Sequence, residues 1–98
     1  MYIQNLATSD ATLITGSSIV QALTRVQICN TEASDSASID LYIQDKSDNT
    51  SKTYLLNNTI IPNGATLILE SEDLYFDNVA YDLYIQESTG KSISIITF

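Results

Sequence analysis

Apolar and polar residues alternate with a period of two in two nearly identical segments of the chain, Asp40–Asp45 and Asp82–Glu87. This alternation is typical of a β-strand that buries one face and exposes the other. In each segment the Leu and Ile side chains point to one face, and the Asp, Tyr and Gln side chains point to the other. We therefore expect two strands in equivalent places of one sheet structure, with Tyr42 and Tyr84 on its outer side.

The rest of the chain consists of further strand-like segments separated by turn-forming residues. Pro62-Asn63-Gly64 is the strongest turn signal, because proline fixes φ and cannot donate to a ladder, while Asn-Gly accepts positive φ. The segments between the turns are rich in β-branched and aromatic residues, which favour strands. The expected strands are Tyr2–Leu6, Thr12–Thr15, Ile19–Cys29, Ile39–Asp45, Thr53–Leu56, Thr66–Glu70, Ala80–Glu87 and Ser92–Thr97.

One segment, residues 18–30, also fits a helix, with Ser18 as its N-cap and Asn30 near its C-cap. We favour a strand, because a lone helix would leave the faces of the neighbouring strands short of a partner. As a strand, the segment turns inward Val20, Ala22, Thr24, Val26 and Ile28.

A succession of short strands predicts an all-β fold. We expect residues 1–98 to form a single domain, an immunoglobulin-like Greek-key β-sandwich of about seven to eight strands; a small β-barrel or jelly roll is the alternative. The expected core consists of Val20, Ala22, Val26, Ile28, Ile39, Leu41, Ile43, Leu67, Leu69, Leu83, Ile85, Ile93 and Ile95.

Charge narrows the class of partner. Twelve acidic residues against four basic ones give a formal net charge of −8. Such a surface repels phosphate backbones and anionic lipid headgroups, which disfavours nucleic-acid and membrane binding. The chain has no apolar run near the roughly 18 residues of a transmembrane segment and no signal-peptide pattern, so we expect synthesis and folding in a cytoplasm.

The residues that usually carry catalysis are absent or isolated. The sequence contains no histidine, the commonest proton shuttle and metal ligand. Its three glycines are scattered, so no phosphate-binding loop is present. The single Cys29 has no catalytic partner and is interpreted as a small buried or half-buried hydrophobe. We therefore expect a protein that is not an enzyme, with no catalytic residue, no metal and no cofactor.

Two acidic segments are the remaining candidates for cation binding or acid–base chemistry. In residues 45–56, Thr50 stands where a calcium loop needs glycine, and Leu56 stands where it needs a bidentate glutamate. The second segment, residues 70–77, has few aromatic neighbours that could build a sugar site. We expect solvated loop carboxylates at Glu70, Glu72, Asp73 and Asp77.

Protein contact is the function that the pattern leaves open. Tyr42 and Tyr84 face outward, where tyrosine serves either cross-strand packing or a subunit contact. In the last expected strand, Ile96 and Phe98 lie opposite the core-facing isoleucines, and apolar residues on both faces suggest burial by a partner. The terminal strand is therefore a candidate sheet edge. The candidate contact residues are Tyr42, Tyr84, Ile96 and Phe98.

Three stretches that span most of the chain follow one another in the sequence. They are a strand ending in Ile28-Cys29-Asn30-Thr31 that leads to Ile39–Ile43, the segment Ile61–Leu69, and the segment Glu72–Phe76 that leads to Tyr81–Ile85. Together they resemble small structural proteins of tailed bacteriophages, of the capsid-decoration, neck or tail-adaptor type. The resemblance implies a place in the virion, association with copies of the same chain, and docking on a larger capsid or tail protein.

A carbohydrate- or host-surface-binding module is the alternative function, because aromatic residues near an exposed sheet face would serve such binding. The chain has no tryptophan, and few of its aromatic residues lie in turns. We therefore favour the virion structural protein.

Overall fold

β-strands and the turns between them make up the described part of this computed structural model, which is residues 2–14, 23–74 and 76–98. All of the strand pairings are antiparallel. No helix in these residues is long and apolar enough to cross a membrane. The strands are β1 (Tyr2–Leu6), β2 (Thr12–Leu13), β3 (Arg25–Asn30), β4 (Ala37–Asp45), β5 (Lys52–Ile61), β6 (Thr66–Glu70), β7 (Tyr81–Glu87) and β8 (Ile93–Thr97).

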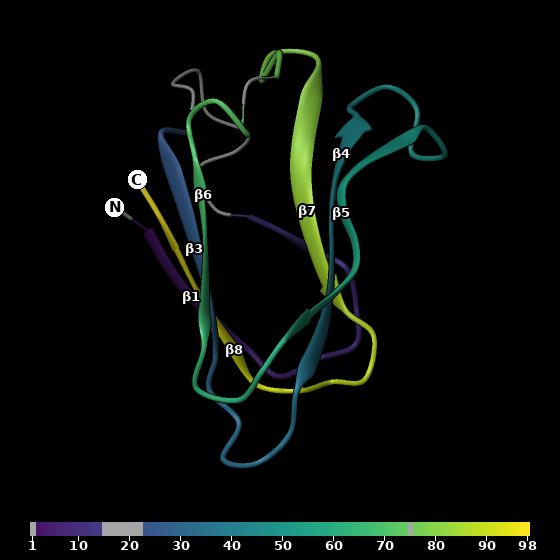
Figure 1. Ribbon diagram of the computed structural model, residues 1–98. Coiled ribbons are helices and arrows are strands. Elements are labelled where there is room, and N and C mark those ends of the chain that lie inside the picture. The colour runs from purple at the N-terminus through teal and green to yellow at the C-terminus, as the bar shows by residue number, and fades with distance from the viewer. Residues whose placement is uncertain (1, 15–22, 75) are drawn as a thin grey trace.

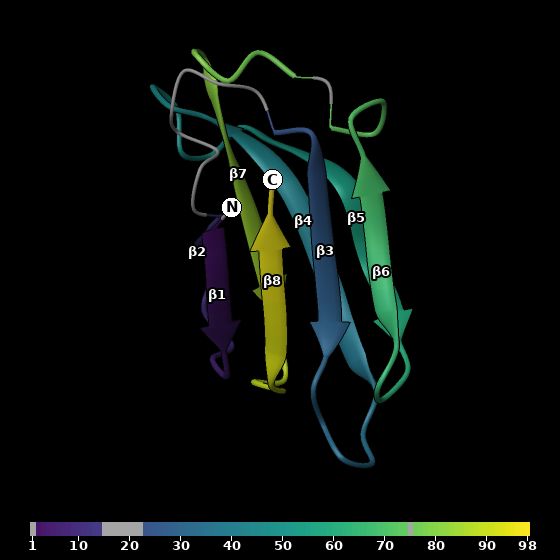
Figure 2. The same cartoon turned by 90° about the vertical axis from the view of Figure 1, so that its left-hand side faces the viewer.

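The strands form two four-stranded sheets with the orders β1-β8-β3-β6 and β2-β7-β4-β5. Figure 1 shows the two sheets as facing layers, with β1, β3, β6 and β8 in one and β4, β5 and β7 in the other. Consecutive strands run in opposite directions along the sandwich, so β1 begins and β8 ends at the same end of their sheet (Figure 2). The expected all-β sandwich is confirmed.

The strand order is that of a jelly roll, the alternative arrangement considered above. β1 pairs with β8, β2 with β7, β3 with β6 and β4 with β5, as in one long hairpin that is rolled over on itself. Rolling adds the contacts of β3 with β8 and of β4 with β7. In an immunoglobulin-like sandwich the first two strands share a sheet. Here β1 and β2 lie in different sheets, so the immunoglobulin-like connectivity was wrong.

The core lies between the two sheets, where inward-facing residues of both layers meet. Ile43, Leu67 and Leu69 are only partly buried and pack against its rim. Val20 and Ala22 lie outside the described residues. The expected core residues that are buried are Val26, Ile28, Ile39, Leu41, Leu83, Ile85, Ile93 and Ile95.

Connections between the strands supply further core residues that the alternating pattern does not mark. Leu74 lies in the turn-rich segment between β6 and β7, yet it is 2% exposed and belongs to the core cluster. Leu23 precedes β3 and packs into the same cluster. The other buried apolar residues of the cluster that we did not predict lie at strand ends: Ile14 directly after β2, Ala37 in β4 and Ile61 in β5.

Strand β5 is longer than expected because Asn57-Asn58 forms a bulge and not a turn. Asn58 has a φ of 51°, a left-handed conformation that asparagine tolerates better than most residues. Its backbone N–H donates to Asp40 Oδ1 at 2.7 Å. The register between β4 and β5 shifts beside this point, so the chain continues as a strand to Ile61.

We expect substitutions of Asn58 to follow the backbone preference of the new residue. Asn58→Gly should leave stability nearly unchanged, while Asn58→Val should cost about 1–2 kcal/mol because a β-branched residue is strained in the left-handed region. Urea unfolding measures both free energies. Asn57→Val, at the exposed neighbouring position of β5, is the control; equal losses at both positions would contradict the strained bulge.

The ambiguous segment, residues 18–30, contains a strand, β3, in its second half. Residues 25–30 form β3, which rules out a helix over that part. The strand begins at Arg25, later than the predicted start at Ile19. The predicted strand residues 19–22, and Thr15 of the preceding strand, lie outside the described residues.

Candidate contact surfaces

A row of tyrosines crosses the outer face of the β2-β7-β4-β5 sheet. Leu13 lies opposite Tyr84, Tyr84 opposite Tyr42, and Tyr42 opposite Tyr54. The rings of Tyr42 and Tyr84 are stacked with centroids 5.7 Å apart, and those of Tyr42 and Tyr54 are tilted at 5.4 Å. Ring pairs at these separations stabilise a sheet by cross-strand packing.

Tyr42, the centre of this row, is covered by its own neighbours. It is 2% exposed, and the ammonium of Lys52 lies 5.0 Å from its ring centroid. The alternation placed Tyr42 on the correct face, but its accessibility depends on the rings that β5 and β7 bring beside it. Tyr84 is half-buried and Tyr54, on the edge strand, is 48% exposed. A partner on this face would therefore meet Tyr54 and Tyr84 before Tyr42.

The burial of Tyr42 predicts a late ionisation. Desolvation raises the pKa of its phenol above the ordinary 10.0, and the nearby Tyr54, Tyr84 and Asp40 raise this pKa further. We expect the difference between the ultraviolet titration curves of the wild type and Tyr42→Phe to lie above pH 10.0. A difference centred below that pH would show that solvent reaches the ring.

The other outward residues of the repeated hexapeptide make contacts within the chain. Asp40 accepts the hydrogen bond of the β5 bulge. Gln86 Nε2 donates to the carbonyl of Ser9 at 3.0 Å, and Asp82 Oδ1 lies 3.7 Å from Lys46 Nζ. These contacts join β4 and β7 to neighbouring segments, so the repeated residues hold the sheet together.

The terminal strand was predicted to be a sheet edge, and this prediction was wrong. Strand β8 lies between β1 and β3 (Figure 2). Its Ile93 and Ile95 enter the core, while Ile96 lies on the outer face and is half-buried by the flanking strands. β8 therefore has apolar residues on both faces because one face enters the core and the other belongs to an apolar outer surface of the sheet.

This outer surface of the β1-β8-β3-β6 sheet carries a mostly apolar row with two exposed isoleucines. Ile3, Ile96, Gln27 and Ile68 follow one another in register across all four strands. Ile3 is 59% and Ile68 47% exposed, and Phe98 in the next row is 38% exposed. We call Ile3, Ile68, Ile96 and Phe98 the isoleucine face.

Charges are few on the isoleucine face. The guanidinium carbon of Arg25 lies 4.2 Å from the ring centroid of Phe98, an arrangement in which the ring attracts the cation. Glu70 lies opposite Arg25 in the pairing of β6 with β3. This row thus contributes one base and one acid at the margin of the apolar line.

The row on the other side of the isoleucines is polar and uncharged. Asn5 lies opposite Ser94, Ser94 opposite Cys29, and Cys29 opposite Thr66. Cys29 is a free thiol and half-buried, as predicted. Its place in this row puts it on the outer side of the sheet, beside the isoleucine face.

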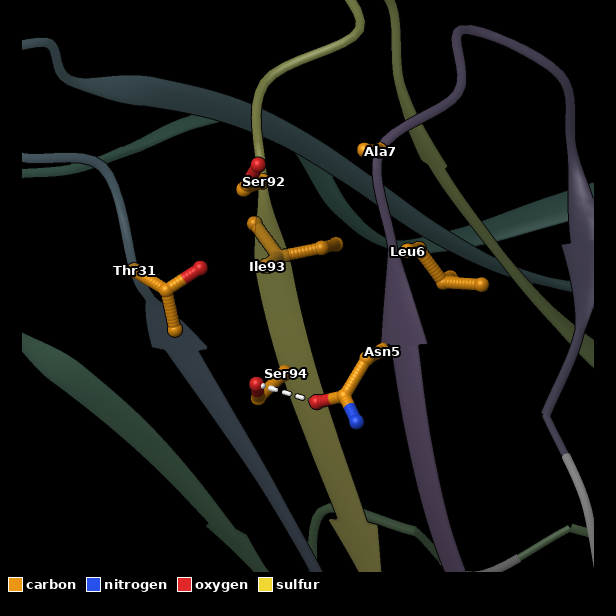
Figure 3. Close-up of a pocket in the computed structure, with 7 residues that line it drawn as sticks. All are labelled: Asn5, Leu6, Ala7, Thr31, Ser92, Ile93 and Ser94. Atoms are coloured by element: carbon orange, nitrogen blue, oxygen red, sulfur yellow. Dashed lines mark hydrogen bonds between the residues drawn. The ribbon is translucent and has the colours of Figure 1, made fainter.

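A shallow hollow of about 400 Å³ opens at this polar end of the sheet. Figure 3 shows the side chains of Asn5 and Ser94 pointing toward one another, with Ser94 Oγ donating to Asn5 Oδ1 at 2.6 Å. Small hydroxyl and amide groups dominate its polar lining, so it offers hydrogen bonds without charge. Its lining residues are Asn5, Leu6, Ala7, Thr31, Ser92, Ile93 and Ser94.

The acidic turns use their carboxylates locally. Asp48 Oδ1 accepts hydrogen bonds from the backbone and hydroxyl of Thr50, and Asp77 Oδ1 accepts from the N–H of Val79. Within the described residues, no group of three or more His, Cys, Asp or Glu residues is placed to hold a metal ion. These carboxylates act as caps of turns.

Asn30 is a buried polar residue that the sequence interpretation named only as a possible helix C-cap and did not place in the interior. Its Nδ2 donates to the carbonyls of Asp35 and Ile61, both at 2.9 Å, and its Oδ1 accepts from the N–H of Glu32. It therefore fixes the loop after β3 against the end of β5. The available signal was its inward position in the alternation that buries Val26 and the other core residues of β3.

Glu87 is a second buried polar residue, 2% exposed at the end of β7. Its carboxylate accepts hydrogen bonds from the N–H of Ser38 at 2.9 Å, from the hydroxyl and N–H of Thr89, and from the N–H of Lys91. It thus joins the start of β4 to the turn between β7 and β8. Its sequence signal was a charged residue at an inward position of the repeated strand pattern.

No family model matches the chain, and no curated protein matches it either.

Proposed function

We propose that this chain is a non-enzymatic structural protein of a bacteriophage particle, in capsid decoration or as a head or tail adaptor. It would act by associating with copies of itself and by docking on a larger virion protein. The observation that carries this proposal is the isoleucine face, a partly exposed apolar surface on β1, β8 and β6 of one sheet. Exposed apolar patches of this kind mark protein-interaction sites.

The strand order and the sequence resemblance support a place in a particle. Jelly rolls of eight strands build viral capsid domains, among other proteins. The stretches that resemble small phage structural proteins form β3, β4, β6 and β7, together with the turn around Pro62. Synthesis in the host cytoplasm followed by assembly into the virion is consistent with both the jelly-roll strand order and the sequence resemblance.

Density-gradient fractionation of a phage lysate tests this proposal. An antibody raised against the purified chain should detect it in the particle band, and the chain should remain there after washing at high ionic strength, which removes proteins held only by screened surface charges. A host cytoplasmic protein serves as the control for trapping. Recovery of the chain only in the soluble fractions would refute the proposal.

A sugar- or host-surface-binding module is the second candidate, and the tyrosine row is the observation that favours it. The exposed Tyr54 and the half-buried Tyr84 lie near the amide and carboxylate groups of Gln44 and Asp40. Jelly rolls also build lectin domains. Binding on a glycan array that Tyr54→Ser abolishes, while the protein is absent from particles, would establish this function in place of the first.

A further inference from the structure

The two outer faces of the sandwich differ in how they meet solvent. On the β2-β7-β4-β5 face, polar Asp and Gln residues flank the tyrosine row. Two of them, Asp40 and Gln86, form hydrogen bonds within the chain. On the opposite face, the central row is apolar at three of its four positions, and two of these, Ile3 and Ile68, are 59% and 47% exposed. The isoleucine face is therefore an apolar sheet surface whose exposure to water is unfavourable.

Charge decides which partner can cover this face. The whole chain carries a formal net charge of −8, but the three described rows across this sheet contain only one base, Arg25, and one acid, Glu70. A basic partner would be drawn to the acidic remainder of the surface. A second copy of this chain, itself strongly acidic, meets the least like-charge repulsion when it approaches through this neutral face.

The geometry of the face suits contact with its own copy. A two-fold axis brings the same patch of each molecule together, and such a patch must be self-complementary. Gln27 lies in the apolar row, and its amide both donates and accepts, so it can pair with the same residue of a second copy. The isoleucines on either side of Gln27 would pack against each other, as inner faces do in stacked sheets.

We propose that the isoleucine face packs against the isoleucine face of a second copy of this chain. The inference rests on the proposed function and names one partner and one contact surface for it. Four strands and five residues a strand give a footprint of roughly 19 by 17 Å, which is small for a protein interface. The dimer should accordingly be reversible and visible by its dependence on concentration.

Sedimentation equilibrium of the purified full chain tests the dimer. Between about 1 and 300 µM protein, a range that covers weak complexes, the mean mass should rise from the 10.8 kDa of one chain toward twice that value. A mass that stays at one chain over the whole range would overturn the proposal.

A matched pair of variants tests the surface. Ile68→Glu places a like charge on both copies and should weaken the dimer at least about tenfold. Ile60→Glu is the control, because Ile60 is 60% exposed on strand β5, away from this face, and it should leave the dissociation constant unchanged. Thermal unfolding of both variants checks that each is folded. An equal loss of dimer in both variants would overturn the assigned surface.

Cys29 provides a second, independent measurement. It lies in the row next to the isoleucines, so its reaction with a thiol reagent should slow as the protein concentration rises through the dissociation constant. In Ile68→Glu the concentration at which the reaction slows should rise at least about tenfold. A wild-type rate that does not depend on concentration, in a protein that dimerises, would place the contact elsewhere.

The outcomes separate this inference from the proposed function. The chain could be found in particles and yet be a monomer in solution, with Ile68→Glu preventing its incorporation. In that case a larger virion protein covers the isoleucine face, and the proposed contact with a second copy is wrong. If the chain dimerises as described but is absent from particles, the virion function is wrong and the dimer remains.

Discussion

Leu41→Asp, or equally Leu83→Asp, is expected to leave the chain unfolded. Both side chains are 0% exposed at the centre of the core. Truncating a buried leucine costs about 2–5 kcal/mol, and burying an unpaired carboxylate costs several kcal/mol more. Together these costs rival the whole stability of about 5–15 kcal/mol of a natural domain. Circular dichroism and thermal unfolding measure the result.

Gln44→Asp is the matched control for this experiment. Gln44 lies on the same strand as Leu41 but on its outer face, opposite one acid, Asp82, and one base, Lys52. The same charge added there should change the free energy of unfolding by no more than about 0.5 kcal/mol. If Leu41→Asp kept the wild-type melting temperature, the assignment of inward and outward positions in β4 would be wrong.

Glu87→Gln is expected to destabilise the protein by about 2–4 kcal/mol, because hydrogen bonds to a charged group are stronger and a buried donor that loses its acceptor is costly. The carboxylate accepts from the N–H groups of Ser38 and Thr89 and from the Thr89 hydroxyl. The glutamine amide keeps the shape but turns an NH₂ group toward at least one of these donors. Urea unfolding at neutral pH measures the loss.

Glu87 also predicts a pH dependence. Burial alone would raise the pKa of its carboxyl group, but the hydrogen bonds from Thr89, Ser38 and Lys91 outweigh burial and lower this pKa below the ordinary 4.5. The folded state therefore favours the ionised carboxylate. The stabilisation is present above pH 4.5 and is lost as the pH falls through the lowered pKa of the folded state.

The control for Glu87 is Glu72→Gln, which removes the same charge from an exposed turn. We expect the free energy of unfolding of wild type and Glu72→Gln to fall steeply below pH 4.5, while that of Glu87→Gln falls less. Parallel curves for wild type and Glu87→Gln would show that the hydrogen bonds to Glu87 do not favour its ionised form.

Local patterns predicted the strands well where turns bounded them. β1 and β6 have the bounds expected from the sequence, since a polar, turn-forming segment begins within two residues after each. The bulge in β5 was missed because Asn57-Asn58 is equally typical of a turn, and only pairing with β4 distinguishes the two. A short-range signal cannot tell a reversal of the chain from an extra residue in a strand.

The order of the strands in the sheets could not be predicted from local sequence patterns. Alternation indicates which side chains face inward, but it does not indicate which strand lies beside which. For that reason the prediction that β8 is an edge strand was wrong, since β8 lies between β1 and β3. The burial of Tyr42 has the same origin, because it depends on Tyr54 and Tyr84, which lie far from it in the sequence and next to it in register.

The pairing of β1 with β8 also determines when this protein can fold. Among the described strands, the sheet neighbour of β1 is β8, and Tyr2 pairs with Thr97, far from it along the sequence. During synthesis β1 therefore cannot pair with β8 until β8 has left the ribosome, and β2 cannot pair with β7 until β7 has done so. Contacts of such long sequence separation slow folding. Until β8 has emerged from the ribosome, the apolar residues of β1 remain exposed to other nascent chains and to chaperones.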